Sequence, residues 1–172
     1  VGKFCKGAKI IHIDVDDSEL GKNVSVDLGI RGDVKDAITR IIAKVNAKKN
    51  PEWWAQIADI KKFVAENEAK QIGSLTPYEV IGTVNSYLGT DNPVATDVGQ
   101  HQMWTAQKYC FEKPRTFMTS GGLGTMGYGM GAAIGACVAT GKRTVLFTGD
   151  GSFGMNLNEM ATAVSQNLPL II

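Results

Sequence analysis

Three glycine-containing segments hold the residues best suited to binding a ligand. These segments are 97–102, 120–127 and 149–153. Each follows a short stretch with the character of a strand, and open α/β sheets bind ligands at the carboxyl ends of their strands. In the third segment, Gly149 and Gly151 flank Asp150 and let the backbone turn sharply beside a carboxylate. A hard oxygen ligand next to exposed amides suits Mg²⁺ that bridges to a phosphate group.

Each of these features also has an ordinary structural interpretation. An aspartate between glycines is typical of a tight turn, although the apolar residues 145–147 before Asp150 and a helix after it favour a ligand site. Gln100 and His101 are neutral donors suited to phosphate oxygens, but a lone histidine in a loop is often a surface or packing residue. His12 lies inside a predicted strand and is interpreted in that second way.

The glycine run at 121–129 supports a rival hypothesis. Gly122, Gly124 and Gly127 form a G-x-G-x-x-G match, which in a nicotinamide or flavin dinucleotide fold places a pyrophosphate at a helix N-terminus. A glycine at every fourth position over 127–135 would instead serve close helix packing. Asp150, the next acid between glycines, lies about where a dinucleotide fold has its ribose-binding carboxylate. It is followed by Gly151 and Ser152, a second phosphate-type turn that such a carboxylate does not need, and this argues against the dinucleotide fold.

The composition restricts the classes of partner. With 172 residues, of which 44% are hydrophobic, the chain can bury a core of its own. Eighteen basic and 17 acidic side chains give a net charge of +1, so we expect no nucleic-acid partner. Glycines and polar residues interrupt every apolar stretch, so we expect no membrane partner. The three cysteines form no C-x-x-C pair, which favours a reducing compartment, and we expect the cytoplasm.

Residues 1–47 are expected to be the end of an α/β domain. Alternating apolar and polar residues at 9–16 and a shorter stretch at 26–30 predict two strands. Asp33 then precedes apolar residues that share one helix face up to Val45, and its carboxylate can cap that helix. This part of the chain is therefore predicted to fold as two strands and a helix.

The next segment, 48–72, is predicted to be a helical linker. Its helix runs from Glu52 to about Lys70 and carries an apolar stripe that we expect to pack on a neighbour. Residues 73–172 are predicted to form part of another domain. Thr76, with a proline and a glutamate following it, is typical of a capping box that starts a helix.

Strands and helices alternate through this last part of the chain. The expected strands are 94–97, 115–119, 144–148 and 169–172. The expected helices are 77–88, 102–109, 121–140 and 155–166. The alternation predicts an α/β fold in which helices flank a parallel sheet on both faces. The chain starts without Met and stops within a predicted strand, so we expect a cut piece of a longer protein.

Residues 149–153 resemble the start of the thiamine-diphosphate fingerprint, which opens with G-D-G and closes with paired asparagines that would lie beyond Ile172. The longer blocks 97–104 and 119–129 are similar to the large, catalytic subunit of acetolactate synthase (acetohydroxyacid synthase) in particular. The similarity extends over essentially the whole chain. The first predicted domain then resembles the end of the family's central FAD-binding domain, and the last resembles the first part of its thiamine-diphosphate domain.

The resemblance implies site residues as well as a fold. The residues implied to hold thiamine diphosphate are Val98, Gly99, Gln100, His101, Gly124, Met126, Gly149, Asp150, Gly151 and Ser152. Asp150 would bind Mg²⁺. Met126 would wedge beneath the cofactor and bend it while Gly124 contacts the pyrimidine, although an isolated methionine is otherwise a filler of core gaps. The residues implied to contact FAD are Asp14, Val15, Gly32 and Asp33.

The resemblance also implies a reaction. The family joins two molecules of pyruvate, or pyruvate and 2-oxobutyrate, to 2-acetolactate or 2-aceto-2-hydroxybutyrate with release of CO₂, in the biosynthesis of the branched-chain amino acids valine and isoleucine. It implies a homodimer or tetramer, and a regulatory small subunit in the biosynthetic form. The catalytic glutamate of the family belongs to an N-terminal domain outside this sequence, so the isolated chain is expected to be inactive.

Two alternatives stay open beside this interpretation. The parent protein could be another thiamine-diphosphate-dependent carboligase or an oxo-acid decarboxylase. The chain could also be a non-catalytic remnant that binds the cofactor weakly or not at all. The block from Gly99 to Trp104 favours the synthase over the first alternative. Cofactor binding and activity of the full-length protein would separate it from the second.

Overall fold

The computed structural model describes residues 2–69 and 75–172. The chain divides into two compact units, Val1–Lys62 and Phe63–Ile172. The predicted end of the linker helix at Lys70 and the predicted domain boundary between residues 72 and 73 lie outside the described residues.

The first unit contains two parallel strands followed by a helix. The strands are β1 (Ile11–Asp14) and β2 (Leu28–Arg31), with the 3-10 helix η1 (Asp17–Glu19) between them in the sequence. Both predicted strands are confirmed, although the second begins two residues later than expected. Their parallel pairing places the two carboxyl ends at the same edge, since Asp14 is the partner of Arg31.

Asp33 caps the helix α1 (Val34–Ile42), as predicted. Its Oδ1 atom accepts hydrogen bonds from the backbone N–H groups of Lys35 at 2.8 Å and Asp36 at 3.1 Å. These are two of the N–H groups that the first turn of a helix leaves without a partner in the helix. The helix ends at Ile42, so Val45 lies outside it and the predicted helix face is shorter than expected.

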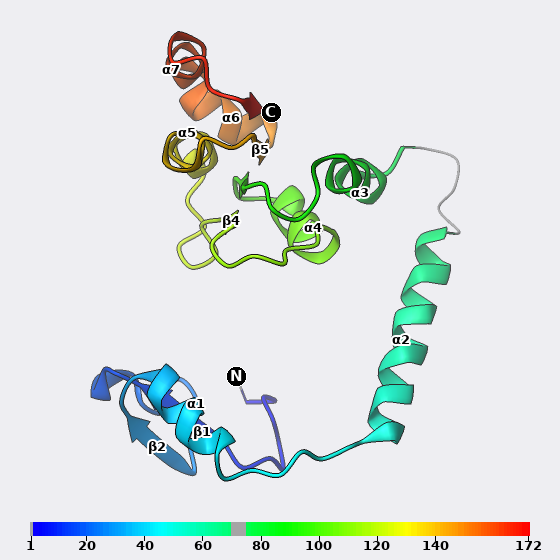
Figure 1. The fold of residues 1–172 in the computed structure, drawn as a ribbon, viewed down its shortest axis with the longest axis vertical. Helices are drawn as coiled ribbons and strands as arrows, with labels where there is room; N and C mark the ends of the chain where they lie inside the picture. Colours follow the sequence, from blue (N-terminus) through cyan, green and yellow to red (C-terminus); the bar gives the residue numbers. More distant parts are fainter. Residues whose placement is uncertain (1, 70–74) are drawn as a thin grey trace. The chain divides into compact units, whose positions relative to one another are not determined.

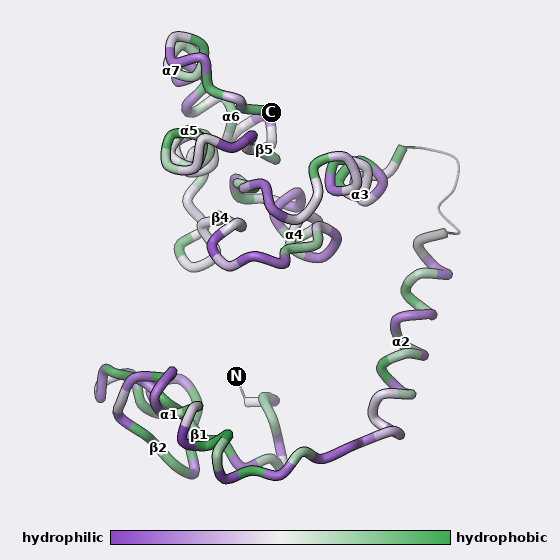
Figure 2. The backbone as a smooth tube through the Cα atoms, in the orientation of Figure 1, coloured by the Kyte–Doolittle hydropathy of each residue, from purple (hydrophilic) through white to green (hydrophobic). Residues whose placement is uncertain are grey.

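The helix α2 (Pro51–Ala69) confirms the helix predicted in segment 48–72. Figure 2 shows hydrophobic and hydrophilic residues alternating along it. Most of its large apolar side chains are exposed, with Trp53 61% and Trp54 66% accessible. No helix in the described part of the chain is long and apolar enough to cross a membrane.

The second unit alternates helices and strands, as predicted. Its strands are β3 (Val94–Thr96), β4 (Phe117–Met118), β5 (Thr144–Phe147) and β6 (Leu170–Ile171). Its helices are α3 (Pro77–Leu88), α4 (Gln100–Lys108), α5 (Tyr128–Thr140), α6 (Asp150–Asn156) and α7 (Met160–Ser165), with the 3-10 helix η2 (Leu157–Glu159) before α7. The strands form one parallel sheet in the order β4-β3-β5-β6.

Helices cover both faces of this sheet (Figure 1). On one face, Val94 of β3 packs in a cluster with Ile81 of α3. The next residue of the same strand, Ala95, packs with Met130 of α5 in a second cluster. Successive side chains of a strand point to opposite faces, so the two clusters lie on the two sides. The predicted parallel sheet flanked by helices is confirmed.

Thr76 and Glu79 form the predicted capping box at the start of α3. The backbone N–H of Glu79 donates to Thr76 Oγ1 at 3.2 Å, and the backbone N–H of Thr76 donates to Glu79 Oε2 at 2.8 Å. The hydrogen bonds from Thr76 lower the pKa of Glu79, because they favour its charged form. The start of α3 is therefore fixed by residues adjacent in the sequence.

Three helices of the second unit begin elsewhere than predicted. The helix α4 begins at Gln100, two residues earlier, and α6 begins at Asp150, five residues earlier. Conversely, α5 begins at Tyr128, seven residues later. Gly124 (φ 66°) and Gly127 (φ 83°) adopt left-handed conformations, which a right-handed helix cannot continue through. The last predicted helix is also divided, because η2 separates α6 from α7.

Close packing at α5 involves only one of the three glycines predicted for it. A Cβ atom added to Gly131 or Gly135 would meet nothing within 4 Å, whereas one on Gly127 would lie 3.1 Å from Asn156 Nδ2. The tightest approach is at Gly129, where a Cβ atom would lie 2.7 Å from a side-chain carbon of β5. The predicted packing face is therefore wrong for two of its three positions.

Candidate cofactor site

The carboxyl edge of the four-stranded sheet brings together the segments singled out in the sequence. The imidazole of His101, in the first turn of α4, lies between two of them. Its Cε1 atom is 2.9 Å from the position of a Cβ atom on Gly99 and 3.4 Å from that of a Cβ atom on Gly149. Segments that follow β3 and β5 are thus in contact, although about 50 residues separate them in the sequence.

The glycine-rich segment after β4 joins the same edge. Met126 Cε lies 3.3 Å from the position of a Cβ atom on Gly151, and Val98 Cγ1 lies 3.7 Å from that of a Cβ atom on Gly124. All three predicted segments therefore meet through side chains placed against glycine backbone. Met126 is 44% exposed, so it is not a filler of the core.

Gly99 leaves the space that the ring of His101 occupies. Its φ of 157° is rarely adopted by residues with a side chain, and a Cβ atom there would also overlap with the imidazole at 2.9 Å. The ring can therefore lie across the end of β3 only because residue 99 is glycine.

His101 has a buried ring nitrogen without a hydrogen-bond partner in the described part of the chain. Its Nε2 atom is inaccessible to solvent and has no hydrogen-bond partner among the described residues. Burial lowers the pKa of His101, while the nearby Asp97 carboxylate acts in the opposite direction. An unpaired buried nitrogen is uncommon in folded proteins. The histidine was predicted in a loop, but it lies in a helix.

Side chains that were not predicted from the sequence hold the loop after β4. Thr119 Oγ1 accepts from Gln102 Nε2 at 2.7 Å and from Thr96 Oγ1 at 2.8 Å, while Ser120 Oγ accepts from the backbone N–H of Thr125 at 3.0 Å. The sequence signal that could have indicated this role is a hydroxyl side chain at the end of each of two neighbouring strands. These bonds tie the loop to β3 and α4.

Asp150 is the first residue of α6, and its side chain is exposed at this edge. Ser152 is 2% exposed in the same turn. The described residues contain no group of three His, Cys, Asp or Glu side chains placed to hold a metal ion. Mg²⁺ often takes only one or two carboxylates from a protein and completes its shell with phosphate oxygens and water, so Asp150 fits a metal that arrives with a diphosphate.

The residues implied to contact FAD also lie together, in the first unit. Asp14, Val15, Gly32 and Asp33 line one pocket at the carboxyl ends of β1 and β2. One oxygen of each carboxylate is engaged, because Asp14 Oδ1 accepts from the backbone N–H of Asp16 at 2.8 Å and Asp33 caps α1. The four residues thus line one shared pocket.

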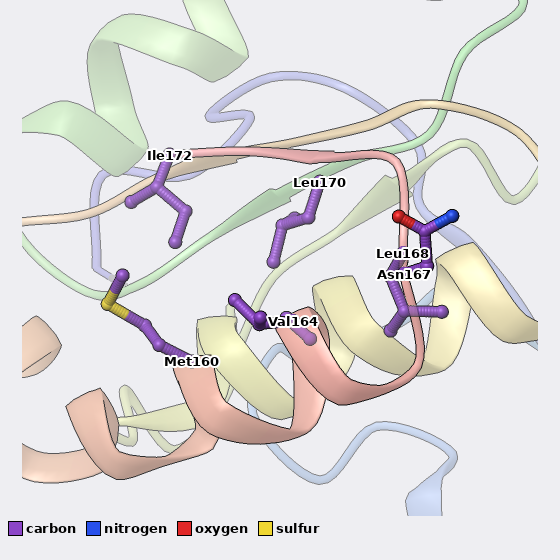
Figure 3. A pocket seen from close by; sticks show the side chains of 7 residues that line it. Met160, Val164, Asn167, Leu168, Leu170 and Ile172 are labelled. Atoms are coloured by element: carbon purple, nitrogen blue, oxygen red, sulfur yellow. The ribbon is translucent and has the colours of Figure 1, made fainter.

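A further pocket, not predicted from the sequence, lies between α7 and the end of the chain (Figure 3). The side chains that line it are mainly apolar and include Met160, Val164, Leu168, Leu170 and Ile172. None of the residues implied to bind thiamine diphosphate lines it. It is therefore separate from the candidate cofactor site.

The chain matches two domain families of one enzyme class. Residues 97–172 match the family described as thiamine pyrophosphate enzyme, C-terminal TPP binding domain. Residues 1–41 match the thiamine pyrophosphate enzyme, central domain. The two matches together cover more than half of the chain and follow each other in the order predicted from the sequence. The chain belongs to the thiamine pyrophosphate enzymes.

Within that class, the chain is similar to acetolactate synthases, several of them described as large subunits. The acetolactate synthase isozyme 1 large subunit of Escherichia coli (strain K12) is 45% identical over 99% of this chain. The acetolactate synthase large subunit of Buchnera aphidicola subsp. Schizaphis graminum is 40% identical over 99% of the chain, and the acetolactate synthase of Mycobacterium bovis is 41% identical over 97%. The chain spans only 30%, 31% and 28% of these relatives' lengths, respectively.

Proposed function

We propose that this chain supplies a thiamine-diphosphate and Mg²⁺ site to an acetolactate synthase large subunit. The parent protein condenses two pyruvates to 2-acetolactate, or pyruvate and 2-oxobutyrate to 2-aceto-2-hydroxybutyrate, with release of CO₂. The observation that carries the proposal is the meeting of His101, Met126 and the segment 149–152 at one sheet edge. The relatives' names support the synthase over another carboligase, a decarboxylase or a non-catalytic remnant.

The residues of the edge divide into a polar group and an apolar group. His101 and the N-terminus of α4 would hold the diphosphate, since N–H groups at a helix start favour anions. Asp150 would bind the Mg²⁺ that neutralises the same diphosphate. Thiamine diphosphate, when bound, supplies the electron sink for breaking and forming bonds beside a carbonyl carbon.

The apolar group would set the shape of the cofactor. Met126 projects from a loop fixed by the left-handed glycines Gly124 and Gly127, and its Cε atom lies beside Gly151. A partly exposed thioether at this position can pack beneath the cofactor and keep it bent, with Gly124 against the pyrimidine. The chain's own contribution is thus to bind, orient and bend, because the glutamate that relays protons in the family comes from another domain.

The remaining parts of the proposal rest on the resemblance of the sequence to the family. FAD would lie at Asp14, Val15, Gly32 and Asp33, with domain limits 1–47, 48–72 and 73–172. The parent would form a homodimer or tetramer, act with a regulatory small subunit in branched-chain amino acid biosynthesis, and reside in the cytoplasm. Free thiols at all three cysteines agree with a reducing compartment. The isolated chain would be inactive.

An assay of the full-length parent protein tests the proposed reaction. The protein, stripped of cofactor and metal, is given pyruvate with thiamine diphosphate, Mg²⁺, both or neither. We expect acetolactate only when both are present. Acetaldehyde or another ligation product would indicate a sister enzyme of the same cofactor, and turnover that needs neither would contradict the proposal.

A further inference from the structure

Asp97 is a buried acid at the end of β3, outside the set of residues expected to touch the cofactor. It is 1% exposed. Its Oδ1 atom accepts from the backbone N–H of Gly129 at 2.8 Å, and its Oδ2 atom accepts from Thr148 Oγ1 at 2.8 Å. Its own backbone N–H donates to Phe147 O at 3.0 Å. A buried carboxylate is tolerated only with such partners, so its contacts define where its neighbours lie.

One of these bonds holds the start of α5. The N-cap position of this helix is occupied by Gly127, which has no side chain to cap it. The Asp97 carboxylate, which follows β3, caps the helix instead, at the positive end of its 13 residues. Met126 immediately precedes the capped turn, so the bond to Gly129 also fixes the point from which the Met126 side chain projects.

The second bond holds the end of β5. Thr148 is the last residue before Gly149 and Asp150, and its hydroxyl donates to the carboxylate of Asp97. The same carboxylate thus connects the residue before the predicted metal-binding segment to the turn after Met126. These two segments meet at Met126 and Gly151, within three residues of each bond.

The packing leaves space for a carboxylate only because residue 129 is glycine. A Cβ atom there would lie 2.8 Å from Asp97 Oδ2 and 2.7 Å from Leu146 Cδ1. Contacts this short essentially never occur, so any side chain at 129 would displace the acid. The absence of a side chain at Gly129 therefore allows the buried Asp97 carboxylate to lie against the helix backbone.

We infer that Asp97 is a positioning residue of the cofactor site. Its carboxylate sets the separation between the Met126 loop and the segment that carries Asp150, so that the apolar wedge and the metal ligand meet the same cofactor molecule. The inference rests on the proposed function, because it assigns Asp97 a role in that site. An acid that only stabilised the fold would alter the stability of the protein and leave cofactor affinity unchanged.

Two pairs of variants of the full-length parent separate these roles. Thr148→Val removes the hydroxyl and keeps the shape, while Thr148→Ser restores it. Asp97→Ala removes both bonds, while Asp97→Asn can accept from Gly129 through its oxygen and donate to the Thr148 hydroxyl through its amide. Tyr109→Phe is the matched control, because it removes a partly buried hydrogen bond of 3.0 Å to Gly89 O on the opposite face of the sheet.

The measurements are the dissociation constant of thiamine diphosphate in the presence of Mg²⁺ and the midpoint of thermal unfolding. We expect Thr148→Val to weaken binding about three- to tenfold and Asp97→Ala at least about tenfold. Thr148→Ser and Asp97→Asn should stay within about threefold of the wild type. Tyr109→Phe should lower the midpoint without changing the dissociation constant.

The results separate the inference from the proposed function. If the wild type binds thiamine diphosphate and Thr148→Val and Asp97→Ala bind it equally well, the inference is wrong and the proposed function stands. Should Asp97→Ala fail to fold, the comparison of Thr148→Val with Thr148→Ser is decisive by itself. If the wild type itself binds no thiamine diphosphate, the proposed function is wrong, and so is the inference that rests on it.

Discussion

The Cε atom of Met126 lies 3.3 Å from the position that a Cβ atom on Gly151 would occupy. This contact joins the loop after β4 to the first turn of α6, and it links the predicted wedge directly to the predicted metal-binding segment. A Cβ atom at this distance would make an unusually tight contact, so the flexible end of the methionine would have to move by a few tenths of an ångström. The relationship can therefore be tested by adding one methyl group.

Gly151→Ala should displace Met126 and weaken binding of thiamine diphosphate several-fold, with little effect on unfolding. In a Met126→Ala background the same change should have a much smaller effect, because the side chain that it displaces is gone. The measurement is a double-mutant cycle of dissociation constants. Gly154→Ala in the same helix is the control, since a Cβ atom there meets nothing within 4 Å. Purely additive effects would mean that the two residues do not act together.

Gly129→Ala should destabilise the protein by about 1–3 kcal/mol, the usual cost of overpacking a filled core. Gly135→Ala in the same helix should do the opposite and stabilise it by about 0.5–1 kcal/mol, because alanine loses less chain entropy in an open helical position. Chemical unfolding of both variants checks the difference in sign. Equal effects would contradict the close approach at Gly129.

The pH dependence of stability should contain a contribution from His101. Burial lowers its pKa below the ordinary value of 6.5, so the unfolded chain binds a proton more readily than the folded one. Stability is therefore full above about pH 6.5 and is lost as the pH falls below it. Thermal unfolding between pH 5 and 8 should show a shallower acid loss in His101→Gln. Parallel curves for the two proteins would show that the imidazole is not held neutral by the fold.

Thr76→Ala should destabilise the second unit by about 1 kcal/mol, the typical effect of losing an N-cap side chain. Thr76→Ser keeps the hydroxyl and should retain most of the stability. Urea unfolding of the two variants provides the comparison. An alanine variant as stable as the serine variant would show that the capping box contributes nothing here.

The sequence predicted the features that depend on neighbouring residues. Asp33 and Thr76 lie next to the N–H groups that they cap, so their roles could be recognised from spacing alone. The parallel sheet followed from the alternation of strands and helices. The predicted cofactor segments came together because parallel strands place their carboxyl ends at one edge.

The features that were mispredicted or missed depend on distant residues or on backbone conformation. The start of α5 is set by left-handed glycines, which the sequence pattern of a glycine-rich helix does not reveal. The partners of Asp97 are 32 and 51 residues away, and no periodicity links them. The buried Nε2 of His101 likewise results from the way that α4 and the end of β5 enclose the ring.

The central claim is that this chain carries a site for thiamine diphosphate and Mg²⁺. Its most direct test is a titration of thiamine diphosphate onto the full-length parent, stripped of cofactor and metal, with and without Mg²⁺. Asp150→Asn is compared with Asp36→Asn, which alters an exposed acid of α1. Binding that Mg²⁺ strengthens in the wild type and in Asp36→Asn, but not in Asp150→Asn, is the predicted result. Equal strengthening by Mg²⁺ in all three proteins, or no binding to the wild type, would contradict it.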